Sequence, residues 1–104
     1  METGNHSQVR QPAVAGMFYP GNPSELAHEV RALLHATASQ TLRGDAPKAI
    51  VAPHAGYIYS GPTAACVYAC IAPAASRIRR VVLLGPTHRV AVDGLALPAA
   101  THFA

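Results

Sequence analysis

The sequence has 104 residues, 8 basic and 5 acidic, with a formal charge of +3 and only 12% charged residues. This length fits one ordinary domain or part of a larger one. The scattered basic residues form no run, which argues against a nucleic-acid partner. The apolar runs are far shorter than the roughly 18 residues needed to cross a bilayer. The polar start carries an acid where a signal peptide has a base, so we also expect no membrane partner.

Leu, Ile, Val and Phe make up only 23 of the 104 residues, which predicts a thin core. The two cysteines, Cys66 and Cys70, are too few for a disulfide framework, so we expect a reducing, cytoplasmic location. They are one turn apart on a predicted helix. We favour small packed thiols over a pair that binds a soft metal.

The N-terminal half predicts one well-marked helix. Residues 1–8 are polar and predicted to be disordered, and residues 9–21 read as an irregular, partly buried segment. Asn22 is a favourable N-cap, Pro23 suits the first helical position, and Glu25 completes a capping box. We therefore predict a helix from Pro23 to Ala38. Its apolar residues form a single stripe, made of Leu26, Val30, Leu33 and Leu34.

The second half predicts a strand, a helix and a second strand. Residues 48–52 and 80–85 are apolar runs typical of buried strands, and residues 63–72 between them read as a helix that follows a loop at 53–61. Such a βαβ unit places its two strands in parallel. Asp93-Gly94 indicates the turn of a small hairpin. The predicted fold class is α/β.

A histidine follows each predicted strand, at His54 and at His88. The carboxyl ends of parallel strands meet at one edge of a sheet, so we expect the two imidazoles to converge there. Two imidazoles suit a metal such as zinc or iron. A third ligand is not evident, and His102 is only a weak candidate. The spacing alone leaves open the alternative of two unrelated loop histidines, hydrogen-bonded to water or backbone.

The loop between the first predicted strand and the helix has features of a ligand pocket. Gly56 and Gly61 allow the backbone to approach a ligand closely, and the helix that follows directs its N-terminus toward the same edge. Tyr57 and Tyr59 would donate hydrogen bonds to a bound ligand, beside Ser60. The alternative is that one tyrosine fills core and the other lies on the surface.

Three strings occur in a characteristic order: RQPAVAGMFYP at 10–20, APHAGYIYSG at 52–61 and LGPTH at 84–88. In these the sequence resembles the Memo family, whose prokaryotic members are called AmmeMemoRadiSam system protein B. The resemblance implies the fold of the class III extradiol ring-cleavage dioxygenases, an α/β sandwich. Residues 9–104 would be the N-terminal portion of one such domain, incomplete at the C-terminus.

The resemblance also implies a non-haem metal site in which His54 and His88 are ligands. The expected metal is Fe(II), with copper and zinc as alternatives, and the expected activity is oxidoreductase-like toward an unknown small molecule. The family's other site residues lie in a C-terminal part, and Cys66 and Cys70 do not match its ligand cysteine. The family name implies a functional link to a radical-SAM protein.

A second hypothesis is a non-catalytic module that binds a peptide or an anion in a vestigial dioxygenase pocket. Whether the chain is an enzyme therefore stays open at the level of sequence. For the 104 residues alone, the sequence predicts a fragment with an exposed sheet edge and unburied apolar helix faces. Such surfaces favour a homo-oligomer or low solubility.

Overall fold

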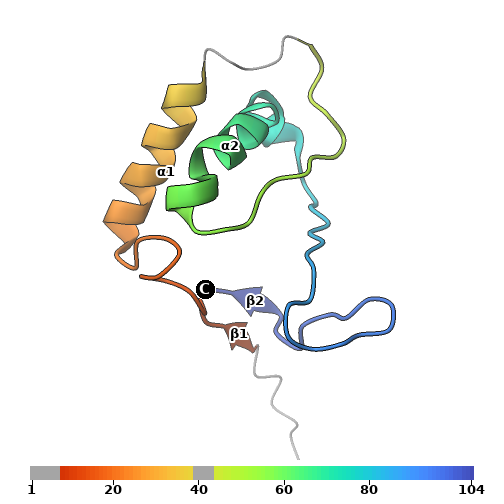
Figure 1. Cartoon of the computed structure of the whole chain (residues 1–104). Helices are drawn as coiled ribbons and strands as arrows, with labels where there is room; N and C mark the ends of the chain where they lie inside the picture. The colour runs from red at the N-terminus through yellow and green to blue at the C-terminus, as the bar shows by residue number, and fades with distance from the viewer. Residues whose placement is uncertain (1–7, 39–43) are drawn as a thin grey trace, which may run out of the picture. The chain divides into compact units, whose positions relative to one another are not determined.

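The computed structural model describes residues 8–38 and 44–104. Its elements in chain order are β1 (Val9–Arg10), α1 (Pro23–Thr37), α2 (Tyr57–Ala69), the 3-10 helix η2 (Ala72–Arg77) and β2 (His102–Phe103) (Figure 1). The chain divides into two compact units, one formed by Met1–Ala13 with Val82–Ala104 and the other by Val14–Val81. The helices belong to the second unit and the strands to the first. In the described ranges no helix is long and apolar enough to span a membrane.

Helix α1 confirms its predicted start and stripe. The side-chain oxygen of Asn22 accepts hydrogen bonds from the amides of Ser24 (2.9 Å) and Glu25 (3.1 Å). These bonds satisfy two of the amide groups that a helix start leaves without intrahelical partners. The helix ends at Thr37 with Ala38 as its C-cap, within one residue of the prediction. Local signals are therefore sufficient to place this element.

Replacing Asn22 with alanine is expected to destabilise the Val14–Val81 unit by about 1 kcal/mol, because two N-terminal amides lose their acceptor. Urea unfolding followed by circular dichroism at 222 nm measures the change. Asn22→Asp keeps an acceptor oxygen and serves as the control, with stability close to that of the parent. An alanine variant as stable as the aspartate variant would show that the cap does not contribute.

Helix α2 begins six residues before its predicted start at Thr63, so that prediction is wrong. The amides of Tyr59 and Ser60 both donate to the carbonyl of Gly56, at 2.9 and 3.0 Å, and close the first turn before Pro62. Because this turn needs no N–H from Pro62, the proline lies inside the helix rather than at its start. The helix ends at Ala69, and the chain tightens into η2.

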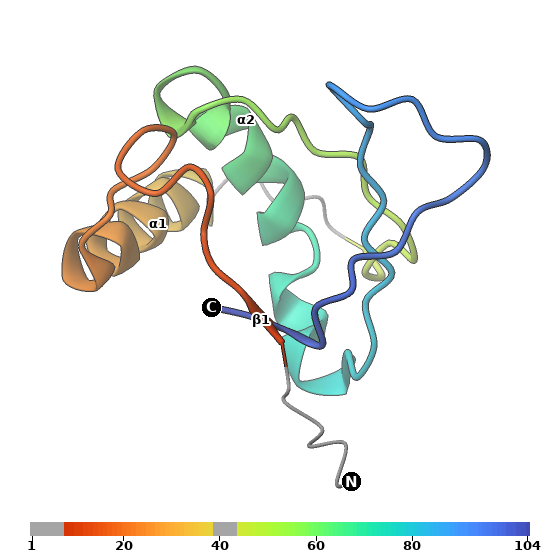
Figure 2. The same cartoon turned by 90° about the horizontal axis from the view of Figure 1, so that it is seen from below.

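Helices α1 and α2 pack side by side, as the two views show (Figures 1 and 2). Gly61 makes the close approach possible, because a Cβ atom there would lie 3.1 Å from Cδ1 of Leu33. The buried apolar side chains of the described residues are small, namely Ala65, Ala69 and Ala74. The thin core predicted from composition is confirmed.

The prediction of two strands in the second half of the chain is wrong. Neither residues 48–52 nor residues 80–85 form a strand, and Val51 is 93% exposed. A strand needs a hydrogen-bonded neighbour, and the described residues offer none to either segment. The predicted βαβ unit is therefore not formed. Asp93-Gly94 makes a bend, with Gly94 at φ 79°, but no hairpin strands flank it.

The strand pair that does form was not predicted. β1 and β2 run parallel, with Val9 opposite His102 and Arg10 opposite Phe103. The carbonyl of Gln8 extends the pairing, since it accepts from the amide of Thr101 at 2.9 Å. Helices together with a parallel pair of two-residue strands are consistent with the predicted α/β class. Of the N-terminal segment predicted to be disordered, residues 1–7 lie outside the described residues.

Candidate functional site

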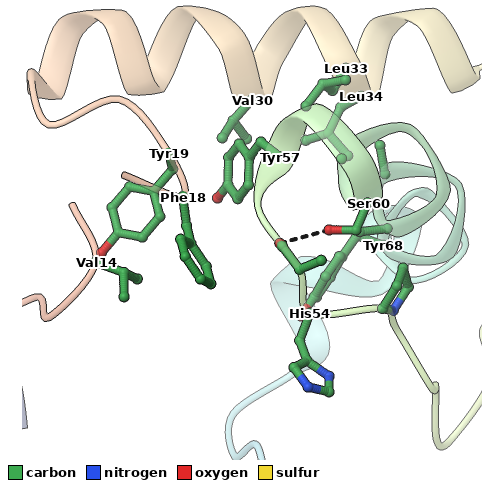
Figure 3. Close-up of a pocket in the computed structure, with 15 residues that line it drawn as sticks. Val14, Phe18, Tyr19, Val30, Leu33, Leu34, His54, Tyr57, Ser60 and Tyr68 are labelled. Atoms are coloured by element: carbon green, nitrogen blue, oxygen red, sulfur yellow. Dashed lines mark hydrogen bonds between the residues drawn. The ribbon is translucent and has the colours of Figure 1, made fainter. Parts of the chain in front are cut away.

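A cavity of about 560 Å³ lies within the Val14–Val81 unit (Figure 3). Three segments build its wall: the loop before α1, the inner face of α1, and the stretch from Pro53 into α2. The lining is mainly apolar and aromatic, and it includes Val14, Phe18, Tyr19, Val30, Leu33, Leu34, His54, Tyr57, Ser60 and Tyr68. Such a lining, with a few polar groups on the wall, is typical of small-molecule and peptide sites.

His54 lies on the wall of this cavity, two residues before Gly56, the N-cap of α2. Its side chain is exposed and, in Figure 3, extends away from α1. The histidine of the APHAGYIYSG string is therefore at the edge of the cavity and open to solvent. In this position the His54 side chain can contact a ligand in the cavity and also a group in the surrounding solvent.

Tyr57 ties the N-terminal loop to the start of α2. Its amide donates to the carbonyl of Phe18 at 2.8 Å, and its ring lies 5.7 Å from the ring of Tyr19, tilted by 39°. This spacing is within the range of favourable aromatic pairs. Tyr59 behaves differently: it is 82% exposed and does not line the cavity. Of the two tyrosines that the sequence assigned to a ligand pocket, Tyr57 lines the cavity and Tyr59 does not.

Ser60 is buried and lines the cavity, but its hydroxyl is directed to the backbone. It donates to the carbonyl of Ala55 at 2.8 Å, the bond drawn in Figure 3, with the carbonyl of Gly56 at 3.3 Å. The amides of Tyr57, Tyr59 and Ser60 also donate to backbone carbonyls. The start of α2 therefore uses these donors internally, and a ligand in the cavity would meet mostly carbon and aromatic surface.

Gly56 is half-buried, and a Cβ atom there would be 3.6 Å from Cα of Phe18, which is ordinary contact. The described packing therefore does not demand glycine at this position. Gly61, by contrast, is buried in the contact between α1 and α2.

The second predicted ligand, His88, is exposed and belongs to the other unit. Its convergence with His54 stays a prediction. His102 lies in β2, with its Nδ1 2.9 Å from the hydroxyl of Thr101. Within residues 8–38 and 44–104, no three His, Cys, Asp or Glu side chains gather as a metal site. Cys66 and Cys70 are half-buried and are not joined by a disulfide, and the thiol of Cys70 donates to the carbonyl of Cys66 at 3.3 Å.

A family model described as Memo-like protein matches residues 10–104. The chain belongs to the Memo-like family. It is 43% identical to a MEMO1 family protein of Aquifex aeolicus over 95 residues, which cover 91% of this chain and 32% of the relative. It is 40% identical to Protein MEMO1 of Xenopus laevis over 93 residues, which cover 89% and 30%. No solved structure matches.

The chain spans about a third of the length of these curated Memo-like relatives. The matched range contains all three strings that carry the resemblance and both histidines. The family assignment therefore covers the cavity as well as the two candidate ligands.

Sequence reasoning missed part of the cavity in this Memo-like chain. The side chains of Val14, Phe18 and Tyr19 come from the loop before α1, which the sequence marks only as irregular and partly buried. The aromatic cluster in GMFYPG was the available signal. The contact between Tyr19 of this cluster and Tyr57, 38 residues further on, depends on the packing of the unit, and no local sequence pattern predicts it.

Proposed function

We propose that this chain supplies two histidine ligands, His54 and His88, to a non-haem metal site of the extradiol-dioxygenase type. The site would belong to a Memo-like α/β sandwich with oxidoreductase-like chemistry on an unknown small molecule. The observation that carries the proposal is the position of His54 on the wall of an apolar cavity, in a string within the matched family range.

The two histidine side chains are donors of the type that such a metal binds. Two neutral imidazoles are common ligands of Fe(II), copper and zinc, and Fe(II) sites of this type add one carboxylate. The described residues do not supply a group of three donors, so a further ligand would come from outside them. A divalent metal bound there would supply Lewis-acid polarisation of an oxygen-bearing substrate.

The chain's own residues would bind the apolar part of the substrate. The paired rings of Tyr19 and Tyr57, with Leu33 and Leu34 from α1, would form the apolar surface that contacts a substrate, in the cavity whose wall also includes His54. Burial of apolar ligand surface there supplies binding free energy, and the histidines would fix the polar end. As part of the same proposal we place the protein in the cytoplasm with a functional link to a radical-SAM protein.

The second candidate function is a non-catalytic module, and the lining of the cavity favours it in one form. Its volume of about 560 Å³ suits a peptide side chain or a small apolar molecule. The cavity suits an anion less well, because the amides of Tyr57, Tyr59 and Ser60 already donate hydrogen bonds to backbone carbonyls. We therefore take an apolar peptide as the ligand of this alternative.

Anaerobic dialysis against Fe(II), followed by metal analysis and a thermal melt, tests the first proposal. We expect close to one iron per chain and a higher melting temperature, both removed by a chelator, because binding to the folded state stabilises it. Copper and zinc are run in parallel. A chain that retains no metal, yet binds an apolar peptide equally well before and after chelation, would favour the module instead.

A further inference from the structure

Two cysteines lie one helical turn apart at the end of α2, outside the cavity lining. Cys66 and Cys70 are half-buried and are not joined by a disulfide, whereas Ala65 and Ala69 beside them are buried. Neither cysteine lines the cavity, so the site proposed around His54 does not use them. Partial exposure distinguishes a thiol that can react with solutes from one that only fills core. The position of the pair therefore favours soft-metal binding over packed thiols.

We propose that Cys66 and Cys70 form a two-coordinate site for a soft monovalent cation with a filled d shell, the chemistry that Cu(I) and Ag(I) share. Binding forms two sulfur–metal bonds and releases the two thiol protons to solvent, with no change of oxidation state. This inference goes beyond the proposed iron site, since it requires neither His54 nor His88.

The spacing of the pair suits a metal bridge better than a disulfide. Cβ atoms four residues apart on a helix are separated by about 5–6 Å, whereas a disulfide needs roughly 3.5–4.5 Å. A metal ion between two thiolates adds two bonds of about 2.3 Å, so it joins sulfur atoms roughly 4.6 Å apart. Side chains on neighbouring turns reach that sulfur separation by rotation about χ1, and the helix does not have to unwind.

The side chain of Cys70 is directed toward the turn that carries the other cysteine. Cys70 is the C-cap of α2 and has helical dihedrals, φ -66° and ψ -26°, so its spacing from Cys66 stays close to one turn. Its thiol donates to the carbonyl of Cys66 at 3.3 Å, which turns the sulfur back along the helix. A bridging ion therefore requires only side-chain rotation.

The donors around the pair select a soft ion. Thiolates prefer Cu(I) and zinc, whereas Mg²⁺ and Ca²⁺ take oxygen ligands. Helix α2 carries no acidic or basic residue, since its sequence is YIYSGPTAACVYA. Zinc needs four ligands, and within the two described ranges no three His, Cys, Asp or Glu side chains come together. An ion that two thiolates satisfy is the best match for the pair.

Anaerobic titration with Cu(I), in competition with a chromogenic chelator, tests the proposal, and Ag(I) is titrated in parallel. We expect one tightly held ion per chain, a thiolate-to-metal absorption band in the ultraviolet, and two sulfur ligands by X-ray absorption. Cys66→Ser and Cys70→Ser should each weaken binding by at least about 100-fold, because only one thiolate remains. Unchanged affinity in either serine variant would overturn the proposal, as would failure of the parent chain to bind Cu(I).

A matched control keeps two thiols but changes their spacing. In Cys70→Ala combined with Ala75→Cys, the second thiol lies on η2 at an exposed position. Its Cu(I) affinity should be as low as that of Cys70→Ser. Tight binding by this control would show that the one-turn spacing is not needed, which overturns the site. Ready formation of a disulfide between Cys66 and Cys70 in air would also overturn it, because the helical spacing would then not hold the sulfurs apart.

The histidine variants separate this site from the proposed iron site. The chain with His54 and His88 both replaced by alanine should keep its Cu(I) affinity within about 3-fold, and the serine variants should keep their Fe(II) content. Loss of Cu(I) with the histidines but not with the cysteines would overturn this inference and leave the iron proposal standing. Cu(I) held by the cysteines in a chain that binds no Fe(II) would support this inference although the iron proposal fails.

Discussion

Replacing His54 and His88 together with alanine is expected to abolish tight Fe(II) binding. Each imidazole would supply one coordinate bond, and loss even of a group that only orients a ligand commonly costs 10–100-fold in metal affinity. We therefore expect each single replacement to weaken binding by at least about 100-fold and the double replacement to leave only non-specific iron. Anaerobic equilibrium dialysis with metal analysis measures the affinities.

His35→Ala is the matched control for this series. His35 is exposed and lies in the last turn of α1, away from the cavity lining. Its replacement should leave both metal content and the circular dichroism of the chain unchanged. Retention of near-stoichiometric iron by the double variant would contradict the proposed ligands. Equal loss in the His35 variant would show that the iron is bound non-specifically.

Replacing Gly61 with valine is expected to push α1 and α2 apart and to destabilise their unit by about 1–3 kcal/mol. Gly61 is buried, and a Cβ atom at this position would be 3.1 Å from Cδ1 of Leu33 and 3.6 Å from Cβ of Tyr57. Valine adds two further methyl groups to that crowded space. Because Leu33 and Tyr57 line the cavity, its shape should change as well.

Urea unfolding compares Gly61→Val with Gly85→Val, since a Cβ atom at Gly85 would meet nothing within 4 Å. The control should be close to the parent in stability. Leu33→Ala in the Gly61→Val background should recover part of the loss, because it removes the atom that clashes, and a double-mutant cycle isolates this coupling. Equal effects of the two valine variants, or no coupling with Leu33, would contradict the close packing of the helices.

The sequence predicts most reliably the features that depend on neighbours along the chain. Asn22, Pro23 and the apolar stripe place α1 within one residue of its observed end. Helix α2 starts earlier than predicted, because the bonds from the Ser60 hydroxyl to the carbonyls of Ala55 and Gly56 are not visible in a propensity pattern.

Features that depend on distant partners were predicted poorly, for a physical reason. The segments at 48–52 and 80–85 have strand-like residues, but a strand exists only when another one pairs with it. The observed pair, β1 with β2, joins residues more than 90 positions apart. In the cavity, His54, Tyr57 and Ser60 were named from their string, whereas the partner ring of Tyr19 follows from packing.

X-ray absorption of the iron-loaded chain tests the central claim most directly, because it reports how many imidazoles bind the metal. We expect two imidazole ligands in the parent chain and one in either His54→Ala or His88→Ala. The same count in His88→Ala as in the parent would contradict the claim that the two histidines meet at one metal.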